Sequence, residues 1–141
     1  MEQYQEFVAN NPVLFVALAV LLATITFVEF KRLTRKYAAL GPNEVVRVLN
    51  QEDGLVLDVR DEAEVRQGRI KGARHIPLKE LKNRMGELQK YRDKSVVVYC
   101  RTGNRSAQAS EILCSNGFAN VINLHGGVVA WQNANLPLSK K

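Results

Sequence analysis

The pattern of apolar and polar residues divides the chain into an N-terminal apolar run and a longer segment of short alternating elements. The run Pro12–Val28 contains no charged residue and only two threonines. As a helix it would rise about 25 Å, and a few flanking residues bring it close to a hydrocarbon core of about 30 Å. We therefore expect a transmembrane helix over residues 12–30.

Two other interpretations of the apolar run are less favourable. A cleaved signal peptide needs a basic leading region and a small-residue cleavage site, but residues 1–11 contain no Lys or Arg and no such site follows the run. A buried core helix would be apolar on every side, and the chain has no second apolar domain to cover it. The membrane anchor is the interpretation that fits best.

The remainder of the chain shows a regular alternation of elements. No breaker interrupts the stretch before Gly41-Pro42, so we expect the membrane helix to continue as a basic linker helix over 31–40. Apolar runs predict strands over 55–59, 95–99 and 120–124, and Gly and Pro punctuate an extended stretch within 70–77. Helical spacing predicts helices over 42–51, 61–68, 78–88 and 106–116, and a short last one within 125–134.

This alternation predicts an α/β domain with a mainly parallel central sheet flanked by helices. We place the domain at 41–138, with a tail at 139–141 and a short N-terminus, 1–11, outside the membrane. In parallel sheets ligands bind at the carboxyl ends of strands. Cys100 follows one of the predicted strands directly, so it lies at such an end.

The net charge of the chain bears on its partners, and the basic residues beside the apolar run bear on its orientation in the membrane. The chain has 141 residues and a net charge of +6, and its segment from Tyr37 onward carries 16 basic and 11 acidic residues. These bases are scattered and few aromatics lie among them, so we do not expect nucleic-acid binding. Basic residues directly follow the apolar run: Lys31, Arg32, Arg35 and Lys36. The positive-inside rule then predicts a single-pass protein of the cytoplasmic (inner) membrane with its C-terminal domain in the cytoplasm.

Cys100 is the first candidate for chemistry. A reducing cytoplasm keeps thiols free, so we expect no structural disulfide. The turn that follows contains Gly103 and Asn104, which tolerate left-handed backbone angles, and it can direct successive N–H groups inward. Together with the N-terminus of the next helix, these groups favour a thiolate, which is the reactive form. We expect residues 101–105 to bind an anionic substrate (Arg101, Thr102, Gly103, Asn104 and Arg105).

The alternative for Cys100 is an inert buried cysteine that ends a strand, because cysteine is commonly buried. Cys114 fits that description better, since it lies inside a predicted helix beside Ile112 and Leu113. A helix would also carry Cys114 about 13 Å from the loop, which disfavours pairing with Cys100. We expect a small core residue there.

The spacing of Cys100 and Arg105, with four residues between them, resembles the active loop of the rhodanese family of sulfurtransferases. Cysteine phosphatases use five intervening residues, and Ser106 stands where their arginine would fall. Two further blocks resemble the family's sequence signatures: Asp58, Val59, Arg60, Glu64, Gly68, Ile70, Gly72, Ala73, His75, Ile76 and Pro77, then Gly126, Gly127, Ala130, Trp131, Leu136 and Pro137. Two positions depart from the pattern: Arg69 stands where His is usual, and Asn135 where Gly is common.

For the other polar and aromatic residues of these blocks we favour structural roles over catalytic ones. We expect Asp58 and Arg60 to form a buried pair that supports the loops, rather than a catalytic acid and base. For His75 we expect a structural hydrogen bond, and for His125 a packed or capping role with general-base duty as the alternative. Trp131 is expected in the core.

The resemblance implies an enzyme that transfers sulfane sulfur from a small anion such as thiosulfate, or from a persulfide, to a thiol acceptor through a Cys100 persulfide. No Cys/His set has metal-ligand spacing and no dinucleotide or phosphate-binding Gly motif is present, so we expect no cofactor. A second interpretation is a membrane-tethered binding module for a membrane protein or a redox partner. A phosphatase or arsenate-type reductase is disfavoured by the length of the loop.

Overall fold

A computed structural model of the chain describes residues 1–140, which fall into two units, Met1–Arg35 and a folded domain from Lys36 onward. The first unit contains helices α1 (Glu2–Asn10) and α2 (Pro12–Leu33). Helix α2 begins with Pro12 in its first turn and has Lys31 and Arg32 in its last. It is long and apolar enough to cross a membrane. Of the predicted tail, residue 141 lies outside the described residues.

The predicted linker helix over 31–40 is wrong. Helix α2 ends at Leu33, and strand β1 (Ala38–Leu40) pairs in parallel with the strand that contains Ile122. The His125 N–H also donates to the Leu40 carbonyl at 2.8 Å, and Tyr37 is buried. Pairing with the edge of the sheet outweighs the local helical preference of this stretch, so the folded domain begins before Gly41.

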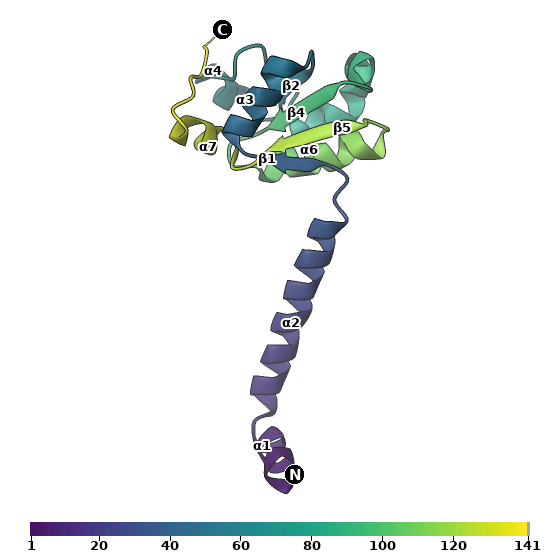
Figure 1. Ribbon diagram of the computed structural model, residues 1–141, viewed down its shortest axis with the longest axis vertical. Coiled ribbons are helices and arrows are strands. Elements are labelled where there is room, and N and C mark those ends of the chain that lie inside the picture. Colours follow the sequence, from purple (N-terminus) through teal and green to yellow (C-terminus); the bar gives the residue numbers. More distant parts are fainter. Residues whose placement is uncertain (141) are drawn as a thin grey trace. The chain divides into compact units, whose positions relative to one another are not determined.

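The domain contains a five-stranded parallel sheet in the order β1-β5-β4-β2-β3 (Figure 1). The remaining strands are β2 (Leu55–Asp58), β3 (Arg74–His75), β4 (Ser95–Tyr99) and β5 (Asn120–Leu124). The helices of the domain are α3 (Pro42–Gln51), α4 (Glu62–Arg66), α5 (Leu78–Leu81), α6 (Asn104–Ser115) and α7 (Gly127–Asn133). The predicted α/β fold with a parallel central sheet is confirmed.

One predicted helix differs in kind. The α-helix expected over 78–88 is α-helical only in α5 and continues as a 3₁₀ helix, η1 (Lys82–Tyr91). A 3₁₀ helix aligns side chains three residues apart, and it directs Met85 and Leu88 into the core. Arg84, on the outer side, forms ion pairs with Glu80 and Glu87.

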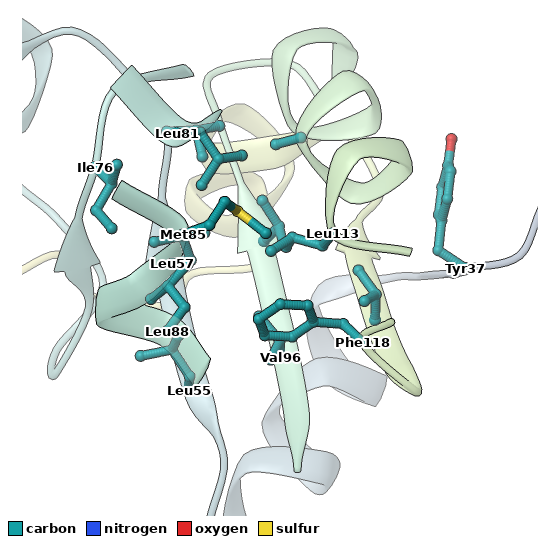
Figure 2. Packing of buried hydrophobic residues seen from close by; sticks show 14 of the residues in the cluster. Tyr37, Leu55, Leu57, Ile76, Leu81, Met85, Leu88, Val96, Leu113 and Phe118 are labelled. Atoms are coloured by element: carbon teal, nitrogen blue, oxygen red, sulfur yellow. The ribbon is translucent and has the colours of Figure 1, made fainter. Parts of the chain in front are cut away.

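Two apolar layers cover the sheet, one on each face. Strand β4 is fully buried, and because side chains alternate along a strand, Val96 and Val98 belong to one layer while Val97 and Tyr99 belong to the other. The first layer also contains Leu57, Met85 and Leu88, which lie together with Val96 in Figure 2. Cys100 follows the same alternation into this first layer, beneath α6.

Candidate active site

Cys100 lies where β4 ends, at the carboxyl edge of the sheet. A short turn of residues 101–103 leads from it into α6, whose first residue is Asn104. Gly103 has φ = 105°, a left-handed conformation that a side chain would strain. This turn folds the chain back over the sulfur and places the N-terminus of α6 beside it.

The Cys100 sulfur accepts a hydrogen bond from the Gly103 N–H at 3.1 Å and lies 3.4 Å from the Ser106 hydroxyl oxygen. Burial raises the pKa of the Cys100 thiol. Hydrogen bonds from the Ser106 side chain and from the N–H groups of Ser106, Gly103 and Thr102 lower it by more, so the net pKa lies below the ordinary thiol value. This geometry supports the predicted thiolate, because amide donors favour the charged form of a buried acid.

The sulfur is less accessible than its position at a strand end suggests. Cys100 is only 1% exposed. A cleft of about 400 Å³ opens next to it, with walls that include Arg101, Gln67, Val129 and Leu138 but not Cys100 itself. The sulfur itself is therefore almost fully covered, although the cleft lies beside its loop.

The two loop arginines differ in their partners. Arg105 makes a bidentate ion pair with Glu64 of α4, at 2.7 and 2.8 Å. Arg105 holds the pKa of Glu64 at about 2, and Glu64 in turn raises the pKa of Arg105. Arg101 is exposed, lines the cleft and has no hydrogen bond or ion pair from its guanidinium within residues 1–140. An anion in the cleft would therefore meet the charge of Arg101, while Arg105 is largely neutralised.

Asp58 and Arg60 form the expected buried pair at the end of β2. The Arg60 Nη2 group donates to Asp58 at 2.7 Å and to the Gly68 carbonyl at 2.7 Å. Arg60 is 4% exposed and Asp58 is 0% exposed. His75 Nε2 donates to the Arg60 carbonyl at 2.7 Å, which is the predicted structural hydrogen bond. These contacts tie the segment after β2 to β3.

The Gly126-Gly127 turn holds the Cys100 loop from the other side. The N–H groups of Val128 and Val129 donate to the carbonyls of Cys100 and Arg101, at 2.9 and 3.1 Å. A Cβ atom on Gly127 would lie 2.4 Å from the Cys100 carbonyl oxygen, and Gly127 has φ = 57°. Only glycine allows this approach, which explains the Gly-Gly pair in the sequence.

Other predicted residues have mixed outcomes. Trp131 is buried, as predicted, and its indole N–H donates to the Pro137 carbonyl at 3.0 Å. For His125 a packed or capping role was expected; its side chain is exposed, so the packed role is wrong, and its backbone N–H donates to the Leu40 carbonyl of β1. Cys114 is partly buried against the first layer, and burial raises the pKa of its thiol.

The two departures from the family pattern have backbone explanations. Asn135 has φ = 59°, the left-handed conformation in which Asn is the best substitute for Gly. Arg69 exchanges two backbone hydrogen bonds with Ser139, at 2.8 and 2.7 Å. Backbone bonds do not depend on the side chain, so Arg satisfies them as well as His would.

Sequence reasoning missed two buried polar residues beside the sulfur, Ser106 and Asn123, which are 0% and 7% exposed. The Ser106 hydroxyl donates to Asn123 Oδ1 at 2.6 Å. Asn123 could have been found, because it is a polar residue between Ile122 and Leu124 in a strand that the sequence predicts to be buried. Sequence reasoning also missed that Glu64 pairs with Arg105, because the two lie 41 residues apart.

Comparisons with known proteins agree with this geometry. Residues 41–134 match the sequence profile of the family described as "Rhodanese-like domain". The chain is 36% identical over 139 residues to "Uncharacterized protein YibN" of Escherichia coli (strain K12), covering 98% of this chain and 97% of that one. It is 44% identical over 92 residues to a "Sulfurtransferase" of Allochromatium vinosum, covering 65% and 84% of the two chains. A crystal structure of a rhodanese-related protein from Thermoplasma volcanium superposes with a TM-score of 0.67 at 31% identity, over 74% of this chain and 100% of that one.

Proposed function

The chain belongs to the rhodanese-like domain family, and on that basis we propose that it is a membrane-anchored sulfurtransferase that carries sulfane sulfur on Cys100. The observation that carries the proposal is the Gly103 N–H directed at the Cys100 sulfur, together with the hydrogen bonds that lower the pKa of its thiol. A thiolate is the nucleophile that sulfur transfer needs. The sulfurtransferase relative from Allochromatium vinosum supports the same activity.

The reaction divides into two displacements, as covalent catalysis does. The Cys100 thiolate attacks the outer sulfur of thiosulfate or of a persulfide. The S–S bond of the donor breaks, and sulfite or a thiolate leaves with the electron pair. The outer sulfur then stays on Cys100 as a persulfide. In the second step an acceptor thiolate, or cyanide in an assay, attacks that sulfur and Cys100 leaves as the thiolate.

The arginines take different parts in this proposal. Arg101 lines the cleft without a partner among the described residues, so it receives the anionic end of the donor. Arg105 is paired with Glu64, so it supports the loop and adds a weaker positive field. Amides of residues 102, 103 and 106 stabilise the charge on the Cys100 sulfur whenever the thiolate forms.

The test is the intact mass of the full chain after incubation with thiosulfate. Formation of the persulfide adds one sulfur atom, about 32 Da, and removal of the nucleophile in Cys100→Ser abolishes the gain. Cys114→Ser is the matched control, since Cys114 is the other free thiol and has a raised pKa. A gain that persists in Cys100→Ser would refute the assignment of the nucleophile.

We also propose that α2 anchors the protein in the inner membrane. Its apolar length and the basic residues that follow it support a single pass with the domain in the cytoplasm. The relative from Escherichia coli aligns along nearly the whole chain, the apolar segment included. The protein should remain in the membrane fraction after an alkaline carbonate wash. A variant without residues 1–35 should leave the membrane fraction during the same wash.

A binding module is the second candidate, and the low exposure of Cys100 favours it. A thiol that is 1% exposed and absent from the cleft wall could be inert while the cleft binds a membrane-protein or redox partner. The mass experiment distinguishes the two functions. No gain of sulfur by the unmodified chain, with thiosulfate or with a persulfide donor, would favour the module.

A further inference from the structure

Cys100 and three other residues form a closed ring of hydrogen bonds that includes the Cys100 sulfur, buried at its Ser106 contacts and partly buried at its Gly103 contacts. The sulfur lies 3.4 Å from the Ser106 hydroxyl, and that hydroxyl donates to Asn123 Oδ1 at 2.6 Å. Asn123 Nδ2 donates to the Gly103 carbonyl at 3.3 Å, and the Gly103 N–H returns to the sulfur at 3.1 Å. Ser106 comes from the first turn of α6 and Asn123 from β5, so the ring joins the loop to the neighbouring strand.

The Ser106 hydroxyl has one proton and two neighbours that can accept it. When Cys100 is a thiol, its S–H can donate to the Ser106 oxygen while the hydroxyl donates to Asn123 Oδ1. A thiolate has no proton to give, so the hydroxyl has to turn toward the sulfur and leave Oδ1. The Asn123 amide is held in its orientation by the Gly103 carbonyl, so Oδ1 stays in place and competes with the sulfur.

We propose that Ser106 and Asn123 are positioning residues that set the protonation state of Cys100, Ser106 by donating to the thiolate and Asn123 by competing for the same proton. The inference rests on the proposed sulfur transfer for its functional meaning. When the persulfide forms, the inner sulfur becomes neutral and the hydroxyl returns to Asn123. When the acceptor attacks, charge returns to the inner sulfur and the hydroxyl turns back to it. No proton changes owner in either step.

The charged groups near the ring cannot produce the pH shifts expected below, because the variants leave those groups unchanged. Arg105 interacts with the Cys100 charge and is itself paired with Glu64. The elements around the loop also carry Arg101, Tyr99, Asp58, Arg60 and His125 at or next to strand ends, Glu111 farther along α6, and Lys79 and Glu80 on α5.

The test measures the pH midpoint of Cys100 ionisation, followed by the ultraviolet absorbance of the thiolate, in the full chain, in detergent and in a Cys114→Ser background; this readout needs no reagent to reach the buried sulfur. Ser106→Ala removes the donor, and we expect the midpoint to rise by about one pH unit, the usual effect of one hydrogen bond to a charged group. Ser106→Thr keeps the hydroxyl and should restore the midpoint. Ser110→Ala is the matched control, because Ser110 is buried on the same helix and, among the described residues, its hydroxyl donates only to the Ser106 carbonyl.

Asn123→Leu separates competition from simple support of the loop. The Gly103 carbonyl keeps its hydrogen bond from the Ala107 N–H at 3.0 Å, so the loop retains a tie when Asn123 is lost. We expect Asn123→Leu to lower the midpoint when Ser106 is present and to lose this effect in the Ser106→Ala background. Equal shifts in both backgrounds, or a Ser106→Ala midpoint equal to that of the parent, would overturn the proposal. Failure of the sulfurtransferase proposal looks different: the persulfide mass gain is absent, whatever the midpoints show.

Discussion

From the ion pair between Glu64 and Arg105 we predict a contribution to the free energy of unfolding, and its size follows from the structure. Arg105 lowers the pKa of Glu64 from 4.5 to about 2. At about 1.4 kcal/mol for each pKa unit, that shift would correspond to about 3 kcal/mol of stability in a fully buried pair. The Glu64 side chain is 28% exposed and that of Arg105 is 32% exposed, so solvent screening reduces the figure. We expect Glu64→Gln to lower the free energy of unfolding by about 1.5 kcal/mol at pH 7.

The pH dependence of this loss has a definite sign. The folded protein holds the pKa of Glu64 below its unfolded value, so the pair stabilises the fold fully above about pH 4.5 and loses its effect as pH falls toward 2. Glu64→Gln has no carboxylate to protonate. The difference in stability between the parent and Glu64→Gln should therefore shrink through that window.

Urea unfolding of the full chain in detergent, at several pH values, measures this difference. Glu62→Gln is the matched control, because Glu62 lies on the same helix and pairs with Arg66 on the open surface, where both side chains are more than 70% exposed. Glu62→Gln should leave the stability almost unchanged. A deficit in Glu64→Gln that stays constant from pH 7 to pH 3, or one matched by Glu62→Gln, would refute the reasoning.

Three further predictions concern the loop and its support. Arg101→Gln should raise the KM for thiosulfate about tenfold with a small change in kcat, because it removes a charge that meets the donor's anionic end; a steady-state assay of thiosulfate and cyanide checks this, and an unchanged KM would contradict it. Gly127→Ala would place a methyl group 2.4 Å from the Cys100 carbonyl, so we expect both the melting temperature and the persulfide yield to fall; Gly72→Ala shares the left-handed backbone (φ = 79°) but has open space around its Cβ, so it should retain the yield. Asp58→Asn should cost about 3 kcal/mol in urea unfolding, because it leaves the Arg60 charge buried without its partner; a loss below about 1 kcal/mol would show that this pair is not a main support.

The sequence predicts the strands of the sheet interior better than its edges. Buried parallel strands are continuous apolar runs, and β4 matches its predicted range without change. Strand β1 was predicted as helix, because residues 38–40 become a strand only by pairing with β5, which lies about 80 residues away. Local propensity contains no information about that partner.

Within the site, contacts between residues close in the sequence could be predicted, and contacts between residues distant in the sequence could not. The proximity of Gly103 to Cys100 follows from a turn of three residues, and the Asp58–Arg60 pair spans only two. The pairing of Arg105 with Glu64 depends on where α4 lies relative to α6. The sequence therefore predicted that Arg101 and Arg105 both bind an anion, whereas in the structure Arg101 has no partner among the described residues and Arg105 is paired with Glu64.

The burial of Cys100 and its nearness to hydrogen-bond donors both result from the face of the sheet to which β4 directs its side chain. Alternation along the strand directs Cys100 to the same face as Val96 and Val98, and therefore beneath the N-terminus of α6. Burial alone would keep the thiol neutral, so a reactive sulfur at this position depends on the amides and the Ser106 hydroxyl. The same enclosure restricts what can reach the sulfur. The outer sulfur of thiosulfate or of a persulfide is one projecting atom, whereas a phosphoryl group has oxygens on every side. A thiol that is 1% exposed therefore favours sulfur transfer over phosphate chemistry. If the protein hydrolysed a generic aryl phosphate through Cys100, the loop would have to open widely, and this argument from enclosure would fail.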